Sequence, residues 1–173
     1  MPHPGLPRGP AQAVEVSVAS AGSELLSFLF ALSGQQDRIR IPARRAPARA
    51  DELWRHTCFE AFLKSPGENC YRELNFSPSG EWAAYRFDGY RAGMAIDPEL
   101  EVPQLEIFSA AGVLEVRTQV RLSGALSAVP VLAVALAAVV ESIDGTLSYW
   151  ALRHAGAKPD FHHPEGFMLE LAR

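Results

Sequence analysis

The chain has 173 residues, of which 48% are hydrophobic and 21% are charged, and its formal net charge is −4. This length suits one globular domain with a sizeable core, so we expect residues 1–173 to form a single domain, with residues 1–12 as a flexible N-terminus. The mildly acidic balance argues against a nucleic-acid partner. The arginines at 44, 45 and 49 among Pro and Ala are typical of a solvated loop.

The segment MPHPGLPRGPAQA contains no apolar stretch of signal-peptide length, and the longest apolar run, residues 129–140, is well short of the roughly 20 residues of a membrane helix. These features predict a cytoplasmic protein with no membrane partner. Cys58 and Cys70 are the two cysteines, and no CxxC or Cys/His metal spacing occurs. We therefore expect reduced thiols and no resident metal.

Short runs of alternating or β-branched residues recur between Pro, Gly and Asp along the chain. In order they are AVEVSVAS, LSFLFAL, RIRI, TCFEAFL, CYRELNFS, EWAAYRF, QLEIFSA, VLEVRTQVRL, residues 129–140, TLSYWALR and GFMLELA. This spacing predicts an all-β fold, an antiparallel β-sandwich of the jelly-roll or immunoglobulin-like kind. The Ala-rich run at 129–140 would also suit a helix, but the Asp144-Gly145 turn after it indicates a β-hairpin.

The Ser-Pro-Ser-Gly sequence at residues 77–80 predicts a turn between two strands. A tight hairpin there pairs Asn75 with Trp82, Glu73 with Ala84 and Tyr71 with Arg86, and sends Leu74, Phe76, Ala83, Tyr85 and Phe87 to the core. The preceding strand adds Glu60 to the polar side. The sequence therefore predicts one sheet face that carries Glu60, Glu73, Asn75, Trp82 and Arg86, a grouping that a one-residue slip would undo.

Such a face has the chemistry of a polyol-binding surface. Carboxylates and Asn bond to hydroxyls, Arg is a forked donor, and Trp offers an apolar plate to a sugar ring. In the structural alternative, Arg86 pairs with Glu60 or Glu73 on a covered face and Trp82 packs beneath a loop. Paired carboxylates also suit a glycosidase, but an adjacent arginine would keep both ionised, which disfavours an acid role.

A second polar cluster lies in YWALRHAGAKPDFHHPEGF, where Trp150, Arg153, His154, Asp160 and His162 are predicted to form one wall of a ligand pocket. Two alternatives use the same residues. One is a metal site made by His154, Asp160 and His162, with His163 or His56, and the other is a loop pinned by histidine-to-backbone bonds. Met94 and Met168 add a haem alternative, although no CxxCH motif is present.

Three motifs give the chain a family resemblance: Trp-x-x-Thr-Cys-Phe-Glu at 54–60, Asn-Phe-Ser-Pro-Ser-Gly-x-Trp at 75–82, and Tyr-Trp-Ala-Leu at 149–152. With them the chain resembles the DOMON-like superfamily from about Val14 to Leu171, and within it the bacterial MurB-like branch, related to family 9 carbohydrate-binding modules. The resemblance implies a β-sandwich that binds a sugar or haem without catalysis. It places Trp54 and Glu60 at ligand-slot positions, while Thr57 stands where the calcium-binding relatives carry an Asp.

We therefore predict a non-catalytic domain that binds a saccharide or a sugar-containing metabolite. The expected ligand-binding residues are Trp54, Glu60, Glu73, Asn75, Trp82, Arg86, Trp150, Arg153, His154, Asp160 and His162. The first alternative is a haem- or metal-binding redox module. Two others are a glycoside-acting enzyme that uses Glu60 and Glu73, and a module that forms a homo-oligomer through an open sheet edge.

Overall fold

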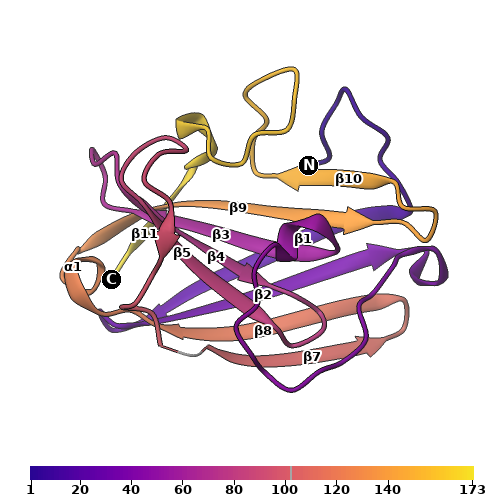
Figure 1. The fold of residues 1–173 in the computed structure, drawn as a ribbon, viewed down its shortest axis with the longest axis horizontal. Coiled ribbons are helices and arrows are strands. Elements are labelled where there is room, and N and C mark those ends of the chain that lie inside the picture. The colour runs from indigo at the N-terminus through magenta and orange to yellow at the C-terminus, as the bar shows by residue number, and fades with distance from the viewer. Residues whose placement is uncertain (102) are drawn as a thin grey trace.

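Two antiparallel sheets pack face to face in the computed structural model, which describes residues 1–101 and 103–173 (Figure 1). The first sheet has the order β1 (Ala11–Ala21), β2 (Leu25–Gly34), β8 (Val113–Arg121) and β7 (Gln104–Ala110). The second has the order β10 (Leu147–Ala151), β9 (Val131–Glu141), β3 (Cys58–Lys64), β4 (Tyr71–Phe76), β5 (Trp82–Phe87) and β6 (Ala95–Ile96), and β11 (Leu169–Ala172) also pairs with β9. The predicted antiparallel sandwich is confirmed.

The helices are short: α1 (Gly124–Ser127) and the 3-10 turns η1 (Gln36–Arg38), η2 (Leu53–Arg55) and η3 (Pro164–Gly166). Within residues 1–101 and 103–173, none has the length and apolar character needed to cross a bilayer. The strand expected at RIRI is wrong. Residues 36–38 form η1, Ile39 makes only an isolated bridge to Ser142, and Pro42 has no N–H to extend a ladder.

The main core lies between the two sheets and follows from alternation along the strands. On β2 the buried side chains are Leu26, Phe28, Phe30 and Leu32. They meet the inner side chains of β3 and β4, and the rings of Phe30 and Phe59 lie 5.1 Å apart. In each strand, alternate side chains thus point into this core, and the side chains between them point to the outer face of the sheet.

Strand β9 is apolar along almost its whole length because both of its faces are buried. Leu132, Val134 and Leu136 face the first sheet, and Ala135 and Ala137 face the loops on the other side. The prediction that the Ala-rich run is a strand is confirmed. So is the hairpin after it, in which Gly145 has φ 86° and Ser142 N–H donates to the Thr146 carbonyl at 2.8 Å.

The predicted register of β4 and β5 is wrong by one residue. Glu73 pairs with Tyr85, Asn75 with Ala83 and Phe76 with Trp82. The cause is the turn: Ser77 N–H donates to the Glu81 carbonyl at 2.9 Å, so the loop has three residues, 78–80, and Gly80 supplies the left-handed conformation at φ 97°. A two-residue loop would have given the predicted pairing.

This shift moves two of the predicted site residues off the polar face. Trp82 is 7% exposed and packs in the core between the sheets. Arg86 pairs with Arg72 in the β4–β5 register and is exposed. Tyr85 and Phe87, which the sequence assigned to that core, instead share a face with Glu73.

The outer face of the second sheet carries a second apolar cluster, made by Phe62, Tyr71, Ala83, Tyr85, Phe87, Ala135 and Ala137. Leu53, Trp54, Ala151, Phe161 and Phe167 pack over it from the loops. In Figure 1 the connection from β10 to β11 lies on this side of the sheet, away from the first sheet. The loops therefore cover much of this face.

The first residues of the chain lie against β10. His3 N–H donates to the Tyr149 carbonyl at 2.8 Å, and Ala151 N–H donates to the Met1 carbonyl at 3.0 Å. The N-terminal ammonium donates to the Ala151 carbonyl at 2.7 Å. These bonds place residues 1–3 beside β10, and the flexibility expected for residues 1–12 stays a prediction.

The turn that sets the register can be tested with Gly80→Ala. A Cβ there would have to adopt φ 97° and would meet the Arg45 carbonyl oxygen at 3.1 Å, so we expect a loss of about 1–2 kcal/mol in the free energy of unfolding, measured by urea denaturation. The matched control is Gly89→Ala, where no atom lies within 4 Å, and we expect a change within about 0.5 kcal/mol. Equal losses in the two variants would contradict this account of the turn.

Candidate functional site

A cavity of about 450 Å³ opens on the outer face of the second sheet, a volume that suits a small ligand. Its floor is formed by Glu60 on β3, Glu73 on β4, Phe87 on β5 and Val139 on β9. Three loop regions and β10 form its walls. These contribute Trp54 and Arg55 from η2, Arg91 and Met94 from the β5–β6 connection, Leu147 and Tyr149 from β10, and Pro159, Phe161 and His162 from the β10–β11 connection.

Two carboxyl groups lie side by side on this floor. Glu60 pairs with Asn75 across β3 and β4, so Glu73 is its diagonal neighbour on the same face. Glu60 is 3% exposed and Glu73 is 4% exposed. The predicted grouping of Glu60, Glu73 and Asn75 is therefore confirmed as a structural arrangement.

The hydrogen bonds of the pair are unequal. Asn75 Nδ2 donates to Glu73 Oε1 at 2.7 Å, and the Cys58 thiol is 3.6 Å from Asn75 Oδ1. Glu60 Oε1 is buried and has no hydrogen-bond partner among the described residues. A buried acceptor without a partner costs free energy, so a hydrogen bond donated to Glu60 Oε1 would be favourable.

Burial raises the pKa of Glu60 well above its usual range, and the negative charge of Glu73 raises it further. Burial also raises the pKa of Glu73, although the Asn75 hydrogen bond and the charge of Arg91 oppose the shift. The pair therefore retains a proton at a pH where exposed glutamates are ionised. The sequence-based argument that Arg86 holds both groups ionised is wrong, because Arg86 lies off this face.

His162 closes the cavity as a neutral ring. Tyr71 Oη accepts a bond from the backbone N–H of Arg91 at 3.2 Å and is hydrogen-bonded to His162 Nδ1 at 2.8 Å. The other ring nitrogen, Nε2, lies 3.8 Å from Glu73 Oε2. Burial, with help from the charge of Arg91, lowers the pKa of His162 to about 4.

Asp160 links the β5–β6 connection to the β10–β11 connection by hydrogen bonds. Its carboxylate accepts two bonds from Arg91, from Nη2 at 2.8 Å and Nε at 3.2 Å, and further bonds from the Tyr90 hydroxyl and from His162 N–H. Burial acts to raise the pKa of Asp160, but these hydrogen bonds outweigh it and lower the pKa. Asp160 therefore positions Arg91 and His162.

Trp54 is positioned by its contact with Tyr85 and by the hydrogen bonds of the segment that precedes it. Its ring packs edge-on against Tyr85 with centroids 5.7 Å apart. The Tyr85 hydroxyl donates to Asp51 Oδ1 at 2.6 Å, and Arg49 binds the same oxygen at 2.7 Å. These bonds hold the η2 segment against the outer face of the sheet.

Of the predicted site residues, Trp54, Glu60, Glu73 and His162 line the cavity, and Asn75 and Asp160 hold lining residues by hydrogen bonds. The others lie elsewhere. Trp150 is 3% exposed in the core between the sheets, Arg153 pairs with Glu165 at 2.6 Å, and His154 Nε2 lies 3.1 Å from the Met1 carbonyl. Trp82 and Arg86 were displaced by the register shift described above.

The sequence missed Tyr149, Phe161, Phe87, Arg55 and Arg91 as lining residues. Phe87 was lost through the register shift. Tyr149 and Trp150 are neighbours on a strand, so only one of them can face the cavity, and alternation alone does not say which. The β5–β6 connection gave no signal for Arg91 beyond its position after a strand.

Within the described part of the chain, no three or more His, Cys, Asp or Glu side chains converge in a way that could hold a metal ion. His154, Asp160 and His162 therefore do not form the metal site considered from the sequence. Cys58 is buried and Cys70 exposed, and both are free thiols.

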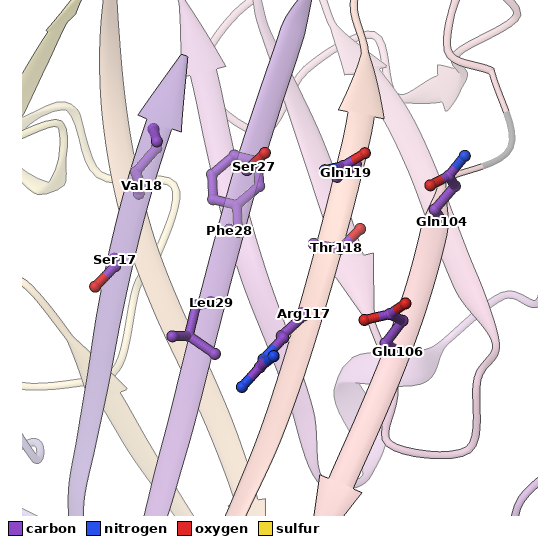
Figure 2. Close-up of a pocket in the computed structure, with 11 residues that line it drawn as sticks. Ser17, Val18, Ser27, Phe28, Leu29, Gln104, Glu106, Arg117, Thr118 and Gln119 are labelled. Carbon is purple, nitrogen blue, oxygen red and sulfur yellow. The ribbon is translucent and has the colours of Figure 1, made fainter. Parts of the chain in front are cut away.

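A second hollow, of about 310 Å³, lies on the outer face of the first sheet. Figure 2 shows its side chains spread over four neighbouring strands, among them Ser17, Ser27, Arg117 and Glu106. Of these, Ser17, Arg117 and Glu106 are exposed. Such groups can bond to water. Thr118, which also lines the hollow, is buried and its Oγ1 has no hydrogen-bond partner among the described residues, but this is a neutral hydroxyl, whereas the cavity over β3 and β4 holds an unpartnered carboxyl oxygen.

The fold is similar to that of a solved protein, a candidate carbohydrate-binding protein from Bacteroides uniformis ATCC 8492. The TM-score is 0.62 and the sequence identity 12%, and the match covers 94% of this chain and 84% of the other. At this identity the likeness shows the fold alone. No protein-family model matches the chain, and no curated protein matches it.

The neutral state of His162 can be measured by NMR. We expect its ring to titrate with a midpoint at about 4. Because this pKa is below that of the unfolded chain, the unfolded state takes up protons first, and His162 lowers stability as the pH falls from about 6.5 towards about 4. The NMR signal that is missing in His162→Gln is assigned to the His162 ring. A titration midpoint near the ordinary histidine pKa of about 6.5 would refute the described burial and hydrogen bonding of this ring.

Glu60→Gln tests the raised pKa of Glu60. A carboxyl whose folded pKa is raised stabilises the fold below its unfolded pKa and loses that contribution as the pH rises through the folded pKa. The variant should therefore gain thermal stability over wild type as the pH rises from about 5 to about 8. Glu106→Gln, on the exposed face of the other sheet, is the control, and a flat difference for Glu60→Gln would contradict the assignment.

Proposed function

We propose that this protein binds a saccharide or a sugar-containing metabolite in the cavity over β3 and β4, without covalent change to the ligand. The observation that carries the proposal is the buried, unpartnered Glu60 Oε1 on a floor walled by aromatic rings. The rings of Trp54, Tyr149 and Phe161 offer apolar plates, and the floor offers acceptors for hydroxyl groups. This combination of a few polar groups in an apolar cavity is the chemistry of sugar recognition.

The fold comparison supports the proposal at the level of fold, because the Bacteroides uniformis protein is named for carbohydrate binding. The resemblance to the DOMON-like superfamily and to family 9 carbohydrate-binding modules agrees with it. We propose that the chain is a member of that superfamily, with Trp54 and Glu60 acting as ligand contacts. Both residues line the cavity.

The arrangement of the carboxyl groups favours binding over catalysis. Glycosidases place two carboxyl groups so that they flank the scissile bond. Here Glu60 and Glu73 rise next to each other from one sheet face, so they reach a ligand from the same side. Turnover of an aryl glycoside that disappears in Glu60→Gln would contradict this part of the proposal.

Haem is the alternative ligand, because Met94 and His162 both line the cavity. The residues fit it poorly. His162 Nδ1 is bound to the Tyr71 hydroxyl, and its Nε2 faces Glu73 Oε2 at 3.8 Å, so neither nitrogen is directed to an iron atom. A Soret band from protein mixed with haem, abolished by His162→Gln, would favour the alternative.

Calorimetric titration with a panel of monosaccharides and oligosaccharides tests the proposal. We expect saturable binding of at least one sugar, and Trp54→Ala should weaken it about fivefold to tenfold through loss of an aromatic plate. The matched control is Phe108→Ala, an exposed ring outside the cavity that is 46% accessible, which should leave the affinity unchanged. Thermal melting checks that both variants fold.

The proposal fails if no sugar in the panel binds. It also fails if a sugar binds equally well to wild type and to a folded Trp54→Ala.

A further inference from the structure

The floor of the cavity carries two buried carboxyl groups and no basic group of its own. The ionisable side chains around Glu60 are Glu73 and Tyr71 from β4, Cys58 from β3, Tyr85 from β5, Tyr149 from β10, Arg55 from η2, and His162 and Arg91 from the loops. His162 is neutral near pH 7, as shown above. Arg91 and Arg55 are therefore the cations available to the pair.

Both of these cations are already paired. Arg91 binds Asp160 at 2.8 Å, and Arg55 binds Glu52 at 2.7 Å. Arg91 still attracts Glu73, yet its own hydrogen bonds go to Asp160 and to no atom of the floor. Glu60 and Glu73 are thus left without a cationic hydrogen-bond donor, and a buried charge of this kind is costly.

A hydroxyl group would give Glu60 Oε1 one hydrogen bond and no charge. A protonated amine would give up to three hydrogen bonds and would neutralise the pair. The rings of Trp54, Tyr149 and Phe161 in the walls add to this preference, because the faces of aromatic rings attract cations. The aromatic walls and the acidic floor of the cavity therefore both favour a protonated amine.

We infer that the cavity prefers a saccharide that carries a protonated amine, an amino sugar, with the ammonium group against Glu60 and Glu73. The inference rests on the proposed function and names its ligand class. Binding a cation beside two carboxyl groups favours their ionised forms, so the shared proton leaves as the ligand binds. The affinity for the amine must then rise with pH, whereas a neutral sugar needs no proton release.

Matched pairs of sugars test the inference: glucosamine against glucose, galactosamine against galactose, and mannosamine against mannose, titrated by calorimetry at about pH 5 and about pH 7. Within at least one pair, we expect the amine to bind about tenfold or more tightly at the higher pH, with a smaller preference at the lower one. Titration in buffers of different ionisation enthalpy should show proton release for the amine.

Two variants test whether Glu60 and Glu73 cause the preference for the amine. Glu60→Gln and Glu73→Gln should each bring the ratio of amine to hydroxyl affinity towards one, and Glu106→Gln should retain the wild-type ratio. Thermal melting confirms that the variants are folded. The ratio of amine to hydroxyl affinity is measured for each variant separately. A substitution that weakens both sugars equally therefore leaves this ratio unchanged.

Neutral sugars that bind as well as or better than their amines would overturn the inference and leave the proposed function intact. A preference for the amine that survives both glutamine substitutions would also overturn it, because the charge would then come from elsewhere. If neither sugar of any pair binds while another sugar of the panel does, the inference fails and the proposed function stands; if no sugar of the panel binds, both fail.

Discussion

The burial of Glu60 and Glu73, beside Asn75 on a largely apolar sheet face, is the constraint on which the rest of this structure depends. Burial raises the pKa of both carboxyl groups, the charge of Glu73 raises that of Glu60 further, and a buried acidic pair costs stability. An apolar pair at these positions would pack with Phe62, Tyr85 and Ala135 at no such cost. Because this pair opposes folding, its place at the bottom of a cavity supports the proposed ligand site.

The rest of the fold holds this pair in place. The core between the sheets fixes the inner face of β3 and β4, and alternation then directs Glu60 and Glu73 outwards. Asp160 joins the loops that carry Arg91 and His162, and the bonds among Tyr85, Asp51 and Arg49 hold the segment with Trp54. Because these contacts form without a ligand, the proposed site is preorganised, which limits the conformational entropy that binding would cost.

Much of this arrangement could be predicted from local sequence. Alternation and turn residues gave the all-β class, the β9 strand and the Asp144-Gly145 hairpin, and the pairing of β3 with β4 correctly grouped Glu60, Glu73 and Asn75. The register of β4 with β5 depended on whether Gly80 adopts a left-handed conformation, and a single extra loop residue moved Trp82 and Arg86 to the other face. The loop residues that close the cavity depend on contacts far apart in sequence, such as Arg91 with Asp160, which no local pattern encodes.

The most direct test of the central claim, that the cavity over β3 and β4 is the ligand site, is a map of backbone amide chemical shifts during titration with glucosamine. The account predicts that the shifts concentrate at β3, β4, η2 and residues 160–162, which surround the cavity. Shifts concentrated at Ser27, Glu106 and Arg117, on the outer face of the other sheet, would contradict it and would place the site in the hollow of Figure 2.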